Sequence, residues 1–328
     1  MSKRRIAAAS AVALGVGFLA VTTTSAQEVQ FTFATTNGVE DLSSQAMLRF
    51  EEMLEERSDG EIQMEFISGG ALGGDQELLQ QLATNEIQMH IAGPVIVHRL
   101  LPQYQCLEAE YVYEDEEHGM RVWTGELGAE VSNALKEQYG IEIAAVGARG
   151  ARHVTSNTPI RDPSDLEGVK IRVTNPLRTE VFAAYGALPG PLSISELYGA
   201  LRQGVFDAQE NPISTIYGNK FYEVQGFINL TGHVQSYNVI TANSAFLESM
   251  TAEQRAIFDQ ALADATLSLN QAVAEETEVL LQKMQTEEVE VVEPDVAAFR
   301  EVALPIVRAF AEENCKPGLL DAIRSSAE

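Results

Sequence analysis

The stretch GVKIRVTNPLRTEVFAAYGALPGPLSISELYGALRQGVFDAQENP (168–212) alternates strand-like and helix-like patterns. Its apolar residues Val169, Ile171 and Val173 recur with the period of a strand. After this strand at 169–173, the pattern predicts a helix at 176–185, a strand near 187–192, a helix at 193–203, a strand at 204–208 and a helix at 212–224. Strands that alternate with helices indicate an α/β architecture.

The alternation continues towards the N-terminus. EIQMEFI (61–67) and EIQMHIA (86–92) are interpreted as two strands of one βαβ unit. The remaining pattern predicts further strands at 28–37 and 141–149, and helices at 41–60, 75–84 and 116–138.

A long helix is predicted after Thr251, which forms a capping box with Gln254. Neither Gly nor Pro interrupts the chain from there to about Thr286. At about 1.5 Å per residue this helix would be on the order of 50 Å long, so we expect it to run across two lobes.

The chain is acidic, with 48 Asp and Glu against 22 Lys and Arg among 328 residues, for a formal charge of −26. Nothing resembles a basic stripe, which argues against a nucleic-acid partner. An acidic surface does not forbid an anionic ligand, because surface charges more than about 10 Å away are largely screened at ~0.1 M salt. Arginines inside a cleft can therefore dominate locally.

The first residues predict a secretory signal peptide at 1–26. Basic Lys3, Arg4 and Arg5 precede the apolar run 6–21, and small residues then lead to a cleavage site near Ala26. No later stretch approaches about 18 uninterrupted apolar residues, so we expect a soluble protein exported to the periplasm. That compartment permits a disulfide, but the sequence leaves open whether the two cysteines, Cys106 and Cys315, pair.

Motifs for catalysis, metals or cofactors do not emerge from the sequence. The five histidines are scattered, and HExxH, CxxC, GxSxG and Walker A spacings do not occur. GGALGG (69–74) lacks the spacing of a dinucleotide-binding loop and is interpreted as a loop before a helix. We therefore predict no metal, no cofactor and no catalytic residue.

Polar residues within segments whose apolar pattern predicts burial are better indicators of a ligand site. Arg172 interrupts a strand, Arg149 and Arg152 follow another, and DAQENP (207–212) places Asn211 at a strand end. Ligands of open α/β sheets bind at the carboxyl ends of strands. The alternatives are a surface ion pair for Arg172 and a helix N-cap for Asn211.

These segments closely resemble the DctP-type solute-binding proteins of tripartite ATP-independent periplasmic (TRAP) transporters. The resemblance is carried by K-I-R-V, S-E-L-Y-x-A-L-x-Q-G, D-x-Q-E-N-P, K-F-Y-E-V-Q and L-T-G-H within 168–233. R-H-V-T-S-N (152–157) and GGALGGDQEL (69–78) fit as well. Order and spacing hold from about residue 28 to the C-terminal helices.

The resemblance implies a two-lobed periplasmic-binding-protein fold with a ligand cleft between the lobes and the long helix spanning both. The first lobe would comprise 27–149 plus about 237–276, and the second 150–236 plus about 277–328. Such a protein is not an enzyme. It captures a small carboxylate and delivers it to a membrane permease that is driven by an ion gradient.

The resemblance also implies roles for individual residues. Arg172 is similar to the arginine that clamps the ligand carboxylate, Arg152 to a second cleft arginine, and Asn211 to an asparagine beside that carboxylate. A guanidinium can hold a carboxylate through two parallel hydrogen bonds, which a lysine cannot do. On the facing lobe, Asn37 and the pair Asp75–Gln76 match cleft positions, with a turn and a helix cap as the alternatives.

Several hydroxyl-pairing groups favour a sugar acid, such as a hexuronate or an aldonate. A C4-dicarboxylate is the alternative within the class, since Arg149 could add a third cation. HIAGPVI (90–96) lacks the acidic residue that sialic-acid binders carry near Gly93, and Ile194 replaces an aromatic residue of some relatives. Two alternatives lie outside the class of transport proteins: a periplasmic enzyme and a ligand sensor, either of them acting on carboxylated sugars.

Overall fold

The computed structural model describes residues 28–326, so the predicted signal peptide at 1–26 lies outside the described residues. The strands form one nine-stranded mixed sheet in the order β2-β1-β3-β8-β4-β7-β5-β6, and β9 pairs with β8. The strands are β1 (Val29–Ala34), β2 (Ile62–Ile67), β3 (Met89–Ala92), β4 (Ile141–Ser156), β5 (Lys170–Val173), β6 (Leu188–Pro191), β7 (Ala208–Pro212), β8 (Phe227–Asn243) and β9 (Glu290–Val292).

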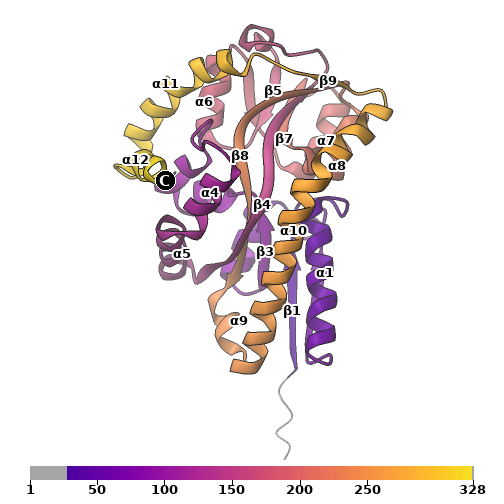
Figure 1. The fold of residues 1–328 in the computed structure, drawn as a ribbon, viewed down its shortest axis with the longest axis vertical. Helices are drawn as coiled ribbons and strands as arrows, with labels where there is room; N and C mark the ends of the chain where they lie inside the picture. Colours follow the sequence, from indigo (N-terminus) through magenta and orange to yellow (C-terminus); the bar gives the residue numbers. More distant parts are fainter. Residues whose placement is uncertain (1–27, 327–328) are drawn as a thin grey trace, which may run out of the picture.

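Two long antiparallel strands, β4 and β8, run the length of the molecule (Figure 1). Strands β1 to β3 extend the sheet at one end, where β3 pairs with β8. Strands β5 to β7 extend it at the other end, where β7 pairs with β4. The fold is therefore the two-lobed α/β architecture that the sequence predicts, with β4 and β8 shared by both lobes. The exact lobe boundaries stay a prediction.

Helices cover both faces of this sheet. They are α1 (Leu42–Arg57), α2 (Asp75–Ala83), α3 (Val95–Leu100), α4 (Glu116–Thr124), α5 (Glu126–Tyr139), α6 (Pro176–Ala184), α7 (Ile194–Arg202), α8 (Ile213–Gly218), α9 (Ser244–Ser249), α10 (Ala252–Thr286), α11 (Val296–Asn314) and α12 (Leu319–Ser325), with 3-10 turns η1 (Pro102–Glu108), η2 (Pro163–Leu166) and η3 (Phe221–Glu223).

The predicted long helix is confirmed as α10, which has 35 residues. Its capping box forms as expected: the Thr251 hydroxyl accepts from the Gln254 amide at 3.2 Å, and the Gln254 side chain accepts from the Thr251 amide at 3.0 Å. The helix contacts α1 at one end of the sheet, β4 in the middle and α8 at the other end (Figure 1). It therefore spans both lobes.

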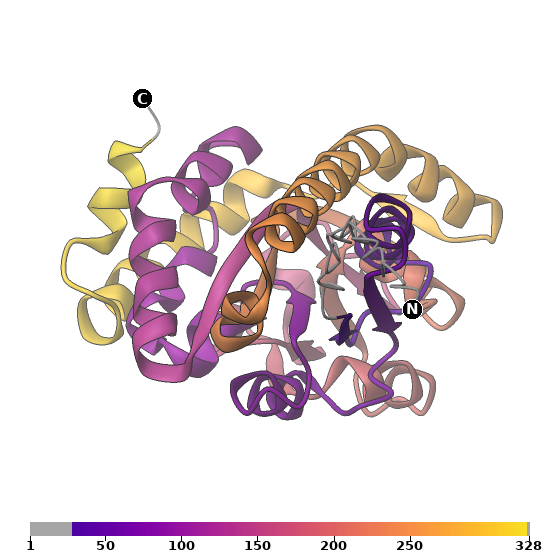
Figure 2. The same ribbon diagram turned by 90° about the horizontal axis from the view of Figure 1, so that it is seen from below.

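The apolar core is divided by the sheet and not by the lobes. Successive strand residues point to opposite faces, so Phe33 joins one cluster with α1, α7, α8 and α10, while Ala34 joins another with α2, α6, α11 and α12. Each cluster draws residues from both ends of the sheet. Figure 2 shows α1 beside α10, with α11 and α12 on the far side of the molecule from α1.

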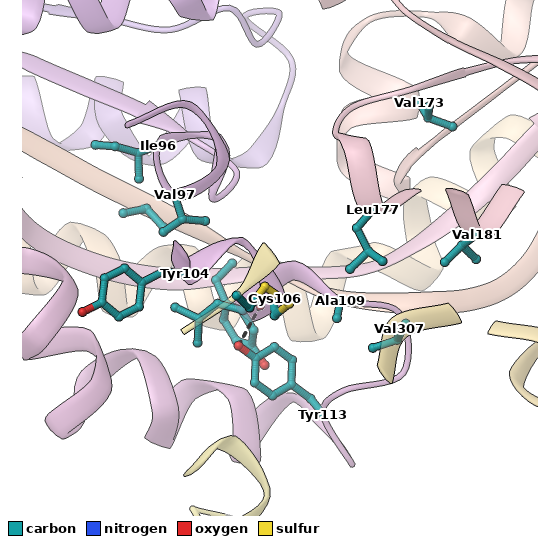
Figure 3. Packing of buried hydrophobic residues seen from close by; sticks show 14 of the residues in the cluster. Ile96, Val97, Tyr104, Cys106, Ala109, Tyr113, Val173, Leu177, Val181 and Val307 are labelled. Atoms are coloured by element: carbon teal, nitrogen blue, oxygen red, sulfur yellow. Dashed lines mark hydrogen bonds between the residues drawn. A yellow bond between two sulfur atoms is a disulfide. The ribbon is translucent and has the colours of Figure 1, made fainter. Parts of the chain in front are cut away.

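A disulfide joins Cys106 in η1 to Cys315 after α11, with the two Cα atoms 6.2 Å apart. The bond lies in the core cluster that includes Tyr104 and Tyr113 (Figure 3). The structure thus answers the question that the sequence left open, and the disulfide ties the C-terminal helices to the η1 turn.

Some predicted elements are displaced. The helix expected at 116–138 is broken at Gly125, where a Cβ would lie 2.6 Å from the Arg121 carbonyl oxygen. The strand expected at 204–208 lies at 208–212 instead, because Gly204 adopts a positive φ of 70° and forms a turn. Strand β4 continues to Ser156, seven residues past the predicted end, and β8 was not predicted.

We predict that the disulfide stabilises the fold because it closes a loop of 209 residues. The double variant Cys106→Ala/Cys315→Ala should lower the free energy of unfolding by about 2–4 kcal/mol in urea titrations. Reductant should lower the stability of the wild type to a similar extent and should not affect the variant. Equal stability of oxidised wild type and variant would contradict this role.

Candidate ligand-binding site

A cavity of about 320 Å³ lies where the two lobes meet, between the start of α2 and strands β4, β5 and β7. All the residues that the sequence suggests for ligand contact line it, namely Asn37, Asp75, Gln76, Arg152, Arg172 and Asn211. Arg149 lines the same cavity. The fold therefore brings together residues that are far apart in the chain.

Arg172 is a buried cation without an ionic partner. It lies on β5 and is 5% exposed. Its Nε donates to the Leu192 carbonyl at 2.9 Å, whereas its Nη1 has no hydrogen-bond partner among the described residues. No ion pair within residues 28–326 includes it. Burial lowers its pKa to about 10, so the guanidinium still carries its charge at neutral pH. The surface ion pair considered for Arg172 is wrong.

Arg152, by contrast, is neutralised by Glu210 of β7. Its Nε lies 2.5 Å from the Glu210 carboxylate, and its Nη2 donates to the same carboxylate at 3.0 Å. The carboxylate also faces Arg178 at 3.6 Å and His233 at 3.1 Å. Burial alone would raise the pKa of Glu210, but Arg152 and Arg178 outweigh burial and hold the pKa well below its usual range. Arg152 thus enters the cavity as part of a buried ion-pair network.

Asn211 lies within β7 and not at a helix N-cap. The position before α8 is Pro212, so the N-cap interpretation of Asn211 is wrong. Its Oδ1 accepts from Arg152 at 3.1 Å and its Nδ2 donates to the Gln209 side chain at 2.6 Å. These contacts fix the amide orientation at the cavity wall.

A β-bulge explains how Arg149 and Arg152 reach the same cavity. Residues three apart on a regular strand point to opposite faces. Between Ala148 and Gly150 the pairing of β4 with β8 skips Arg149, and Gly150 has a φ of 85°. An extra residue of this kind re-aims the side chains beside it. Sequence reasoning placed both arginines after a strand end, whereas they lie within β4.

Arg149 resembles Arg172 in lacking a carboxylate partner. Its Nη2 donates to Asn37 at 3.3 Å and to Thr215 at 3.2 Å, its Nη1 donates to Asn238 at 3.4 Å, and its Nε has no partner among the described residues. Burial lowers its pKa. Gly93 leaves room for it, since a Cβ there would lie 3.2 Å from Nη1.

The facing wall carries acceptors. Asp75 begins α2 without capping it, and its carboxylate accepts from the Thr36 hydroxyl at 2.8 Å and lies 3.8 Å from the His90 ring. Burial alone would raise the pKa of Asp75, but the contacts with His90 and Thr36 lower it, so the group stays an anionic acceptor. Gln76 accepts from Arg99 at 3.1 Å.

Among the wall residues that sequence reasoning missed are Glu108 and His98. Both are largely buried, and their side chains lie 3.0 Å apart. Burial alone would raise the pKa of Glu108, but His98, Arg178 and Arg152 together outweigh burial and lower the pKa. No motif surrounds them, and only their shared place in the cavity marks them.

Residues 28–326 contain no cluster of three or more His, Cys, Asp and Glu side chains arranged to hold a metal ion. No helix in this range has the length and apolar character needed to cross a membrane.

A family model described as bacterial extracellular solute-binding protein, family 7, of the DctP type, matches residues 33–314. This chain belongs to that family. The family 7 protein is 33% identical over 274 residues to a solute-binding protein of Roseobacter denitrificans, covering 83% of this chain and 84% of the relative. It is 30% identical over 253 residues to the 2,3-diketo-L-gulonate-binding periplasmic protein of Escherichia coli, covering 76% and 75% of the two chains.

Solved structures agree. The crystal structure of the Roseobacter denitrificans protein, a TRAP periplasmic solute-binding protein with bound L-galactonate, matches with a TM-score of 0.85 and 30% identity over 93% of this chain and 100% of that one. A TRAP protein from Shewanella oneidensis with bound succinate matches with a TM-score of 0.86 and 26% identity over 92% and 100%. The family 7 chain is thus a solute-binding protein of the TRAP type.

The two arginine environments predict a large loss of stability when one is disturbed and almost none when the other is. Glu210→Gln should lower the free energy of unfolding by about 3–5 kcal/mol, because it leaves Arg152 and Arg178 buried without their shared anion. Arg172→Met, of similar length, should change it by no more than about 1 kcal/mol, since only a hydrogen bond to a carbonyl is lost. Urea unfolding of the ligand-free proteins measures both. A loss for Arg172→Met as large as that for Glu210→Gln would show that Arg172 is structural.

Proposed function

We propose that this protein captures a sugar acid in the periplasm and delivers it to a TRAP permease. The observation that carries the proposal is the buried, unpaired Arg172 at the wall of the cavity. A buried charge without a partner is costly, and a ligand carboxylate would complete the pair. The planar guanidinium suits a carboxylate because it can donate two parallel hydrogen bonds.

The other wall residues support a hydroxylated ligand. Asn37, Gln76 and Asn211 carry amides that donate and accept, and Asp75 and Glu108 carry anionic acceptors. Such groups pair with hydroxyls, which both donate and accept. The relatives support the same choice, since one binds 2,3-diketo-L-gulonate and another holds L-galactonate.

A C4-dicarboxylate is the second candidate. Arg149 supplies another cation without a carboxylate partner in the same cavity, and the Shewanella oneidensis relative holds succinate. The ligand screen described below separates the two candidates.

We infer that binding closes the lobes around the ligand. The loop before α2 and the loop before α7 come from different lobes, and a Cβ at Gly74 would lie 3.0 Å from the Ser193 hydroxyl. The two loops therefore meet at the cavity. A ligand that contacts the arginines of β4 and β5 on one side and α2 on the other would bind the closed lobes more tightly than the open ones. It would therefore favour the closed state.

The proposal has three parts: the protein is exported, it releases its ligand chemically unchanged, and it passes the ligand to a membrane permease. We infer cleavage of the signal peptide near Ala26 and delivery of an unchanged ligand to the permease. Mass spectrometry of the secreted protein tests the first inference. NMR of a ligand incubated with the protein tests the second, and loss of uptake in a deletion strain tests the third. Turnover of the ligand would point instead to an enzyme, and intact uptake to a sensor.

Arg172 variants test the carboxylate contact. Arg172→Ala should weaken binding of the cognate acid at least about 100-fold in calorimetry, because a charge-assisted pair is lost. Arg172→Lys should also bind poorly, since an ammonium cannot replace the bidentate contact. The control is Arg202→Ala, which removes an exposed arginine from α7. Near-wild-type affinity of Arg172→Ala would refute the assigned role.

A thermal-shift screen tests the ligand class. The protein is first denatured and refolded to remove any bound ligand. L-galactonate should then raise the stability by about 2.7 kcal/mol at 100 times its dissociation constant, whereas the corresponding alditol, with the same hydroxyls but no carboxylate, should not. A shift with succinate alone would favour the second candidate. No shift with any acid would overturn the carboxylate proposal.

A further inference from the structure

The arginines buried among residues 28–326 divide into two kinds. Arg152 and Arg178 form ion pairs with Glu210 or Glu110, whereas Arg149 and Arg172 form none. Both unpaired arginines line the same cavity.

None of the hydrogen bonds of Arg149 goes to an anion. Its guanidinium meets only neutral oxygens at 3.2 Å or more, and its Nε has no partner within the described residues. The carboxylate of Asp41 makes no direct hydrogen bond to Arg149: it attracts the guanidinium through space and is linked to it by Thr215, whose hydroxyl donates to Asp41 at 2.9 Å. Asp41 is already engaged as the N-cap of α1, where it accepts from Ser43.

The other acids that line the cavity, which are Asp75, Glu77, Glu108 and Glu196, form no ion pair with Arg149 either. Asp75 is bound by Thr36 and approached by His90, and Glu108 is bound by His98. They act on Arg149 through space only. Gly93 lies beside Nη1, and it has no side chain that could supply a carboxylate.

The two unpaired cations belong to different parts of the sheet. Arg172 lies on β5 and Arg149 on β4, with β7 between them. Neighbouring strands are about 4.8 Å apart, so the two strands are separated by roughly 10 Å. Arg172 contacts Leu192 before α7, whereas Arg149 contacts Asn37 after β1. The cavity therefore presents cations from two separate places, with hydroxyl-pairing groups along the walls.

We propose that the ligand is a sugar diacid, a hydroxylated chain with a carboxylate at each end. Arg172 binds one carboxylate and Arg149 binds the second. Arg149 is then the residue that separates diacids from monoacids. This inference rests on the proposed function, because it assigns a second anionic group to the same ligand site.

The wild-type protein tests this inference without any substitution. Refolded protein is titrated in a calorimeter with galactarate, with galactonate and with galactitol, which share one hydroxyl configuration and carry two, one and no carboxylates. Galactarate should bind at least about tenfold more tightly than galactonate, as expected for an added charge-assisted pair. Glucarate, gluconate and glucitol repeat the series in a second configuration.

Substitutions then locate the second carboxylate. Arg149→Met and Arg149→Lys should both lower the ratio of galactarate to galactonate affinity, the former towards one. Arg172→Met should weaken both acids together. Thermal unfolding of each variant reports whether it folds, and the wild-type series stays decisive if Arg149→Met does not.

The outcomes separate this inference from the proposed function. Binding of the monoacid as tight as or tighter than that of the diacid in both series, or a ratio unchanged in Arg149→Lys, would overturn the diacid inference and leave the sugar-acid proposal standing. Binding of succinate with no binding of either sugar diacid would overturn it in favour of a short dicarboxylate. Failure of every acid to bind would overturn the proposed function itself.

Discussion

The ion pair between Arg152 and Glu210 is the interaction on which the site depends. It joins β4 to β7 at the point where the two lobes meet, and Glu210 at the same time faces Arg178 and His233. One buried carboxylate therefore compensates two buried cations. Because Glu210 pairs with these residues, it acts on Arg172 of the neighbouring strand β5 only through space, and Arg172 has no ion-pair partner within the described residues. The protein keeps a structural arginine and a free arginine side by side.

The free arginines also explain how so acidic a chain can bind an anion. The surplus of acids gives a formal charge of −26, and it is carried mostly by exposed side chains, which solvent and salt screen. Inside the cavity the local balance is different, because Arg149 and Arg172 lack carboxylate partners there. The net charge of the protein therefore says little about the charge that its ligand carries.

Strands β4 and β8 hold this arrangement together. They belong to both lobes, so a residue on β4 is placed relative to both walls of the cavity. The irregular pairing near Gly150 turns Arg149 towards the cavity that Arg152 lines. The long helix α10 and the core clusters on the two faces of the sheet also extend across both lobes. These shared elements thus join the two lobes continuously, and the cavity forms where the lobes meet.

The sequence by itself determined the local elements whose signals are strong. Alternation predicted β1, β2 and β5, and the capping box predicted α10. The motifs of 168–233 predicted the family, and with it Arg172, Arg152 and Asn211. Polar strands were harder to predict, since residues such as Asn229, Thr231 and His233 hide the alternation of β8.

Only the tertiary structure decided which charges are paired. The pairing of Arg152 with Glu210 and of Arg178 with Glu110 depends on contacts between residues 58 and 68 positions apart in the chain. The bulge at Arg149 and the disulfide between Cys106 and Cys315 likewise depend on how distant segments meet. Sequence periodicity reports the face of an element on which a residue lies. It does not report which residue of another helix or strand packs against it. That neighbour decides whether a buried arginine is structural or free to bind a ligand.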